Sequence, residues 1–120
     1  MTEKQIIKEA NYKGYDYKVV KIIPKAPENL IAAILKKWLT PPWFNGYVIL
    51  PKGHKYRDVE CDDIPIDCHG GLTFSGHGIY RTWVIGFECN HFGDNYLVQD
   101  ADYVESECKS IIDQLIELEN

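Results

Sequence analysis

Residues able to do chemistry are concentrated between Asp67 and Asp94. This stretch contains three of the four histidines, His69, His77 and His91, and six of the nine glycines. Glycine weakens strand interiors and marks tight turns or a close approach of a ligand to the backbone. The density of imidazoles, carboxylates and glycines therefore predicts a binding or catalytic site in this stretch.

Two polar groups lie at the ends of an apolar segment, TWVIGFE. If residues 64–69 form a strand, Asp67 and His69 project from the same face, because side chains alternate. His91 and Asp94 follow the apolar segment, where a loop leaving a sheet commonly presents site residues. These four residues could supply two imidazoles and two carboxylates to a divalent metal, although their spacing matches no standard zinc signature. Alternatively, each histidine bonds a carboxylate or a carbonyl and fixes a loop.

Other residues could contact an anionic ligand or a base. Gly70 and Gly71 indicate a hairpin turn whose amides could hold an anion. Trp43 and Phe44 lie in an aromatic turn, which is either a plug of the core or a stacking surface for a base. Thr73 and its neighbours lack the GxSxG pattern of a serine nucleophile.

The four cysteines are scattered without a CxxC pair, at positions 61, 68, 89 and 108. A chain of this length folds without disulfides, so free thiols in a reducing compartment are expected. Cys68 adjoins His69, but alternation on a strand would turn the two side chains apart. Buried, inert thiols are therefore favoured over cysteine catalysis.

Strands are predicted where β-branched and aromatic residues gather or alternate, at residues 15–23, 46–50, 64–69, 72–75 and 81–88. Gly76-His77-Gly78 indicates another flexible point. The polar and irregular residues 52–63 indicate an exposed loop.

Two helices are predicted. Pro27 fits a first helical position, and the apolar stripe in Leu30–Trp38 follows before Pro41-Pro42 ends the helix. Asp100 is the expected N-cap of a second helix, whose apolar residues recur at three- and four-residue steps over Val104–Leu118. The chain is thus predicted to be one α+β domain over residues 1–120. Its antiparallel sheet of about four to five strands would be packed by a central helix and a long C-terminal helix.

Charge and hydropathy limit the partners. The 120 residues carry a formal charge of −5, which argues against general binding of nucleic-acid polymers. A small anionic ligand would need a local patch, and Arg81 and Lys52 lie near the candidate stretch. No apolar run has the length of a signal peptide or a membrane span, so a cytoplasmic protein without a membrane partner is expected.

The segments HGGLTFSG and IGFECNHFGD, with GYVILPKGH upstream, resemble a group of small proteins encoded by phages and prophages. Those proteins carry an HGGLT segment followed by a tryptophan strand and a GF(D/E)CxHxGD segment. The resemblance covers roughly residues 46–107. It implies an accessory or counter-defence protein in the cytoplasm of a bacterial host.

The resemblance and the residue inventory together favour a homo-oligomeric protein that sequesters a nucleotide-derived signalling molecule, without a cofactor. The expected ligand-binding residues are His69, Gly70, Gly71, Thr73, His77, Arg81, His91, Asp94, Trp43 and Phe44. The alternative is a metal-dependent hydrolase or phosphodiesterase acting on such a nucleotide. In that case Asp67, His69, His91 and Asp94 would hold a divalent metal that activates water.

Overall fold

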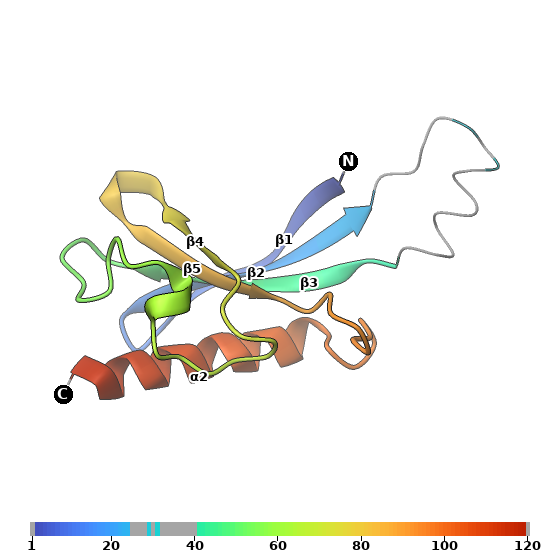
Figure 1. Cartoon of the computed structure of the whole chain (residues 1–120). Helices are drawn as coiled ribbons and strands as arrows, with labels where there is room; N and C mark the ends of the chain where they lie inside the picture. The colour runs from blue at the N-terminus through green and yellow to red at the C-terminus, as the bar shows by residue number, and fades with distance from the viewer. Residues whose placement is uncertain (1, 25–28, 30, 32–40, 120) are drawn as a thin grey trace.

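A computed structural model describes residues 2–24, 29, 31 and 41–119. Within these residues, five strands form one antiparallel sheet in the order β1-β2-β3-β5-β4. The helix α2 (Ala101–Glu119) lies along one face of this sheet (Figure 1). The strands are β1 (Thr2–Tyr12), β2 (Tyr15–Pro24), β3 (Trp43–Leu50), β4 (Phe74–His77) and β5 (Trp83–Glu88). The predicted α+β class and antiparallel sheet are confirmed.

The core lies between α2 and the sheet. Alternation along β2 turns Tyr15, Tyr17 and Val19 toward the helix, as predicted from their spacing. The apolar stripe of α2 packs against them, which confirms the predicted amphipathic helix. Asp100 caps this helix, because its Oδ1 accepts a hydrogen bond from the backbone amide of Tyr103 at 2.9 Å. Further core residues are Val48, Leu50, Ile85, Phe87, Val104, Cys108, Ile111, Ile112 and Leu115.

The strand β1 was missing from the predicted elements. Its sequence, TEKQIIKEANY, is mostly exposed and lacks alternating apolar residues, so no periodic signal marks it. It pairs along its whole length with β2 through a tight turn in which Lys13 and Gly14 both have positive φ. The pairing partner, rather than the strand's own pattern, determines its structure.

The strand predicted at residues 64–69 is wrong. Backbone groups of this segment bond to side chains of α2 instead of a neighbouring strand. The amide of Asp67 donates to Gln114 at 2.8 Å, and the Gln114 side chain donates back to the Asp67 carbonyl at 2.8 Å. Because the segment is not a strand, the inference that Asp67 and His69 share a face does not hold.

Three boundaries also differ from the prediction. Trp43 and Phe44 lie in β3 rather than in an aromatic turn, with Phe44 buried in the core. The strand predicted at 72–75 is β4, at Phe74–His77, so Gly76 and His77 are in a strand. The connection to β5 is the 3-10 turn η2 (Ile79–Arg81), in which Tyr80 and Arg81 have positive φ.

The helix predicted over Pro27–Trp38 falls largely outside the described residues. The loop predicted at 52–63 is confirmed, with a short 3-10 helix, η1 (Cys61–Asp63), at its end. All four cysteines are free, as expected. In the part of the chain that the structure describes, no helix has both the length and the hydropathy of a membrane span.

Candidate functional site

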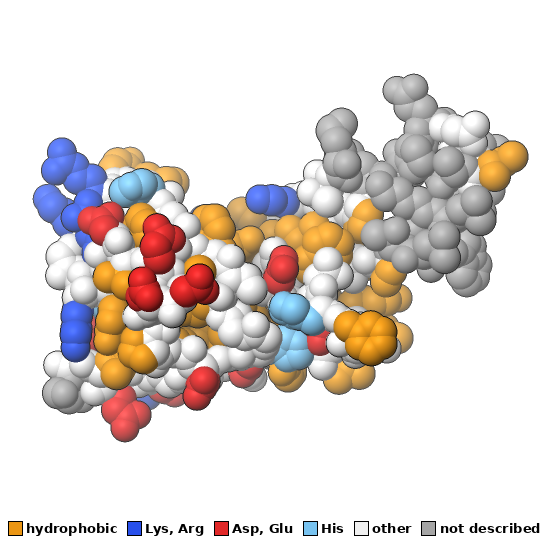
Figure 2. Space-filling view, viewed as in Figure 1, with side chains coloured by type: hydrophobic (Ala, Val, Ile, Leu, Met, Phe, Trp, Pro, Cys, Tyr) orange, Lys and Arg blue, Asp and Glu red, His pale blue; other side chains and the backbone are white. Residues whose placement is uncertain are grey.

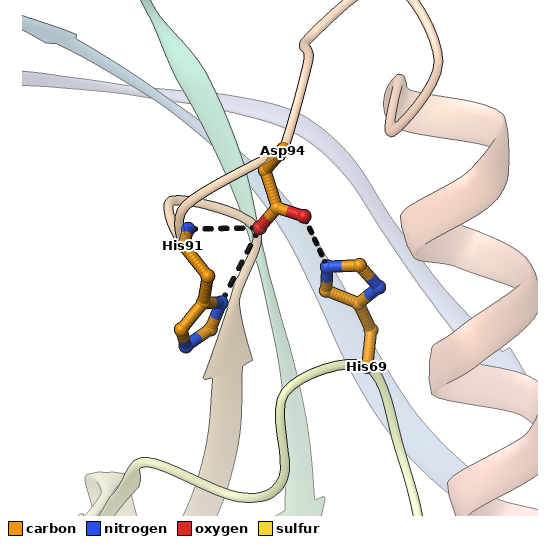
Figure 3. A group of neighbouring side chains, drawn as sticks. All are labelled: His69, His91 and Asp94. Carbon is orange, nitrogen blue, oxygen red and sulfur yellow. Dashed lines mark hydrogen bonds and ion pairs between the residues drawn. The ribbon is translucent and has the colours of Figure 1, made fainter.

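Three of the predicted site residues, His69, His91 and Asp94, converge (Figure 3). One potential ligand atom from each lies within 4.8 Å of the other two. His69 comes from the segment that leads to β4, and the other two come from the loop between β5 and α2. These three residues form the His–Asp cluster.

The carboxylate of Asp94 joins the cluster together. Its Oδ1 lies 2.7 Å from Nε2 of His69, and its Oδ2 accepts the backbone amide of His91 at 2.8 Å. The same Oδ2 lies 3.3 Å from Nδ1 of His91. The Asp94 side chain is 10% exposed and that of His91 is 38% exposed, so the cluster is open to solvent on the His91 side.

The surroundings of Asp94 favour its charged form. Burial alone would raise the pKa of this carboxyl. The backbone bond from His91, and then the hydrogen bond and charge of His69, outweigh the burial and lower the pKa below its ordinary value. Asp94 therefore places a charged carboxylate between two imidazoles.

His69 is held at both ring nitrogens and at its backbone. Nδ1 lies 2.9 Å from the hydroxyl of Tyr103, whose ring meets the imidazole edge to face at 5.4 Å. The backbone amide of His69 donates to Glu107 at 2.8 Å. Because the Asp94 carboxylate accepts from Nε2–H, neutral His69 must accept at Nδ1 from the Tyr103 hydroxyl. Histidines that bind metals are commonly oriented by such a bond at the second nitrogen.

The absence of a side chain at Gly70 leaves space for the His91 ring. A Cβ atom built on Gly70 would lie 2.4 Å from Cε1 of His91. The φ of +69° at Gly70 is also one that other residues rarely adopt. The glycine predicted as a ligand contact thus allows the close approach of the two loops that form the cluster.

The surroundings of the cluster are negative. Burial raises the pKa of the Tyr103 hydroxyl, and the nearby Glu107 and Asp94 raise it further. Within the described residues, the ion-pair partners of Asp94 are His69 and His91, and no lysine or arginine pairs with it. A cation is therefore favoured at this site over an isolated anion.

The thiols beside the cluster are in the wrong state for nucleophilic catalysis. Burial raises the pKa of Cys68 to about 12, with smaller contributions from Glu107 and Asp67. Burial likewise raises the pKa of Cys89 to about 12. Both thiols are protonated at neutral pH, and the thiolate is the reactive form.

His77 and Arg81, also predicted as ligand contacts, lie away from the cluster. His77 is opposite Trp83 at the start of β5, while His91 follows the far end of that strand at Glu88. Those two ends are about 17 Å apart at the rise of a strand. The space-filling view accordingly shows the visible histidine side chains at two separate places (Figure 2).

The remaining predicted residues are dispersed as well. Asp67 is exposed and bonds through its backbone to Gln114, and it is not part of the His–Asp cluster. Gly71 has open space around it. The amide of Thr73 donates to the carbonyl of Gly86 at 2.9 Å. The predicted ligand-binding residues therefore do not all converge on one site.

Sequence reasoning missed Tyr103 and Glu107. Both lie on the first turns of α2 and are spaced four residues apart, so they share one helix face. Their signal was a polar pair adjoining the buried positions of an amphipathic helix. The structure gives this pair a role, because the segment at residues 67–70 passes beside that face of the helix.

No known protein family, curated protein or solved structure matches the chain.

Proposed function

We propose that the chain is a metal-dependent hydrolase that holds a divalent cation with His69, His91 and Asp94 and acts on a small anionic nucleotide. The convergence of three ligand atoms within 4.8 Å carries this proposal. Catalytic metal sites commonly have three protein ligands, with further positions open to water or substrate, and two histidines with one carboxylate are such a set. The exposed side of His91 offers that access.

The chain's own residues support this role in defined ways. Asp94 would supply the anionic ligand, and the hydroxyl of Tyr103 would hold the His69 ring in the orientation for metal binding through Nε2. With a metal on Nε2, that nitrogen would carry no proton, and Nδ1–H would donate to the Tyr103 oxygen. A bound cation lowers the pKa of its water and neutralises phosphate charge.

Charge supports a cation as the bridge to an anionic substrate. The chain has a formal charge of −5, and the residues around the cluster are acidic. A phosphate entering this site unaided would meet a repulsive field. The resemblance to small phage proteins is the reason for considering a nucleotide-derived signal as the substrate.

Sequestration without a metal is supported less well by the same geometry. That hypothesis assigned His77 and Arg81 to the same ligand as His69, His91 and Asp94. The pairing of β4 with β5 separates His77 from the end of β5 that leads to His91. Sequestration by the metal-loaded protein stays an outcome of the experiment below.

The experiment measures metal content first and turnover second. After dialysis against Mn²⁺ or Zn²⁺, the wild type should hold about one ion per chain by elemental analysis, and D94N and H91A should bind at least about tenfold more weakly. H77Q, a histidine variant outside the cluster, is the matched control and should bind normally. Equal metal content in D94N and the wild type would contradict the site.

Turnover is then tested on a panel of cyclic and ADP-ribose-type nucleotides, with recovery of the nucleotide after denaturation of the protein. The proposed function predicts an altered product whose formation stops with chelator and in D94N. Recovery of intact nucleotide from the metal-loaded protein would reject hydrolysis in favour of sequestration.

A further inference from the structure

A small pocket opens on the face of the sheet opposite α2, near the ends of β3 and β5. Its volume is about 180 Å³. Asn45 and Glu88 are directly opposite each other across these two strands, and Phe74 of β4 is opposite Gly86. The pocket is lined by Asn45, Tyr47, Thr73, Phe74, Phe87 and Glu88, and it is here named the Asn45 pocket.

Asn45 lines this pocket and has a side-chain oxygen whose hydrogen-bonding capacity is unused. The residue is 9% exposed, and its Nδ2 donates to the hydroxyl of Tyr47 at 3.1 Å. Its Oδ1 is buried and has no hydrogen-bond partner among the residues that the structure describes. Buried polar atoms are nearly always paired, so such an orphan acceptor calls for a specific explanation. A ligand with an N–H group would supply the missing partner.

Aromatic rings form the walls. Tyr47 and Phe74 meet edge to face, with ring centroids 5.8 Å apart. A Cβ on Gly86 would lie 2.6 Å from Cδ1 of Tyr47, so the glycine lets the Tyr47 ring lie flat on β5. An engineered cavity of about 150 Å³ is large enough for benzene. The Asn45 pocket therefore has room for one six-membered ring beside these two aromatic side chains.

The charge of the residues that line the pocket favours a ligand with hydrogen-bond donors at its polar edge. Glu88 adds a carboxylate opposite Asn45, and the residues lining the pocket include no lysine, arginine or histidine. Two acceptors at one edge fit an amino group attached to a ring, since such a group has two N–H donors. A carbonyl at the same ring position would face Oδ1 without a proton between them.

The pocket is also close to the His–Asp cluster along the chain. Thr73 follows Gly70 by three residues, and Glu88 precedes His91 by three residues. Three residues span at most about 11 Å. The two segments that line one end of the pocket thus continue directly into the loops that carry the cluster.

We propose that the Asn45 pocket binds the amino-bearing edge of a nucleobase, with the amino group donating to Asn45 Oδ1 and to Glu88. This inference rests on the proposed function for its choice of a nucleotide, and it names the base of that substrate. Adenine-type and cytosine-type bases carry the amino group at the ring position concerned. Hypoxanthine and uracil carry a carbonyl there and should be rejected.

The experiment uses nucleosides in the presence of chelator, so that neither phosphate nor metal contributes. Binding to the full chain is followed by NMR through the side-chain amide of Asn45. Adenosine should bind about tenfold more tightly than inosine, and cytidine about tenfold more tightly than uridine, because one hydrogen bond is exchanged for an unpaired acceptor. The Asn45 amide should shift in both cases of tight binding.

Variants locate the effect. N45A should bind adenosine and inosine equally, whereas N45D, which keeps an acceptor, should retain the preference for adenosine. N90A, at an exposed asparagine beyond the end of β5, is the control and should behave as the wild type. Thermal melts verify that each variant is folded.

Any of three results would overturn the inference. The first is equal affinity of the wild type for adenosine and inosine, and the second is tighter binding of the guanidinium ion than of adenosine. The third is an N45A variant that still prefers adenosine to inosine as strongly as the wild type does. Because the metal is absent throughout, failure of these predictions is separate from failure of the metal site, which elemental analysis tests.

Discussion

At the residue scale, the contact between Gly70 and His91 limits what the cluster tolerates. In G70A the new methyl group would lie 2.4 Å from the His91 ring, in addition to the strain at φ +69°. We expect a loss of folding stability of more than about 1 kcal/mol and a weaker metal affinity, because His91 must move. Thermal melts and metal titration measure the two effects.

Gly71 offers the matched control for this substitution. It has a φ of +79° and nothing within 4 Å of a built Cβ. G71A should therefore show the backbone strain, about 1 kcal/mol, with unchanged metal affinity. Equal metal affinities in G70A and G71A would show that the close approach to His91 has no bearing on the cluster.

The contribution of the Tyr103 hydroxyl to the cluster can be tested by removing that one oxygen atom. Y103F removes the partner of His69 Nδ1 while the ring keeps its packing. Stability should fall by about 1 kcal/mol, and metal affinity should fall by about 10- to 100-fold. Calorimetric titration with Mn²⁺ measures the affinity, and Y96F on an exposed tyrosine is the control. A Y103F variant with wild-type affinity would assign Tyr103 to packing alone.

Some of these residues were predictable and others were not, for a physical reason. Residue type was enough to nominate His69, and residue type together with loop position nominated His91 and Asp94. The inclusion of Asp67 depended on the alternation of a strand, and the backbone there bonds to α2 side chains instead. Tyr103 was beyond prediction because its role depends on which helix face the 67–70 segment meets.

At the scale of elements, a charged network ties β1 and β2 to α2. Glu105 of α2 pairs with Lys8 of β1 and accepts from the hydroxyl of Tyr17 of β2. The bonds from Lys8 and then Tyr17 lower the pKa of Glu105 below its ordinary 4.5. Burial, followed by the bond to Glu105, raises the pKa of Tyr17 to about 12. The network therefore needs the carboxylate and the phenol in these states.

The network gives stability a defined dependence on pH. A carboxyl whose pKa is lowered by folding contributes stability above its unfolded pKa, and this contribution is lost as the pH falls through the folded pKa. E105Q should be less stable than the wild type at pH 7, and the difference should shrink progressively below pH 4.5. Denaturant titrations at several pH values measure it.

A second glutamate on the sheet provides the comparison. Glu9 pairs with Lys18 at 3.4 Å, with the glutamate side chain 56% exposed. Exposed pairs contribute little, so E9Q should follow the wild-type pH profile closely. A constant gap between E105Q and the wild type down to low pH would contradict the ionic origin of the effect.

The elements with a strong period were predictable, and the others depended on neighbours. The alternation in β2 and the three- and four-residue steps in α2 reflect burial of one face, which sequence records directly. The edge strand β1 buries little and leaves no such record. The 64–69 segment has strand-like residues, but within the described part of the chain no strand pairs with its backbone.

At the scale of the whole molecule, sheet order decides which predicted site residues meet. β5 separates the two polar regions, because His77 of β4 pairs with Trp83 at its start and the loop to His91 follows its end. Sequence distance alone placed them in one stretch. The predicted homo-oligomer stays a prediction, and light scattering on the purified chain tests it.

The cluster also links three parts of the molecule, so the proposed metal binding is expected to raise global stability. His69 belongs to the segment before β4, His91 and Asp94 follow β5, and the ring of His69 is held by α2. A cation that binds this folded arrangement stabilises it by about 2.7 kcal/mol at one hundred times its dissociation constant. For a chain of this size, the melting temperature should rise by roughly 10 °C.

Manganese is the suitable ion for this measurement, because the four free cysteines would bind zinc in the unfolded chain and reduce the effect. Calorimetry should show the rise in the wild type and in H77Q, its reversal by chelator, and its absence in D94N, where the anionic ligand that joins both imidazoles is gone. An equal rise in D94N would mean that manganese binds elsewhere. The rise in melting temperature and its absence in D94N therefore test the same proposed site, once through the whole molecule and once through a single carboxylate.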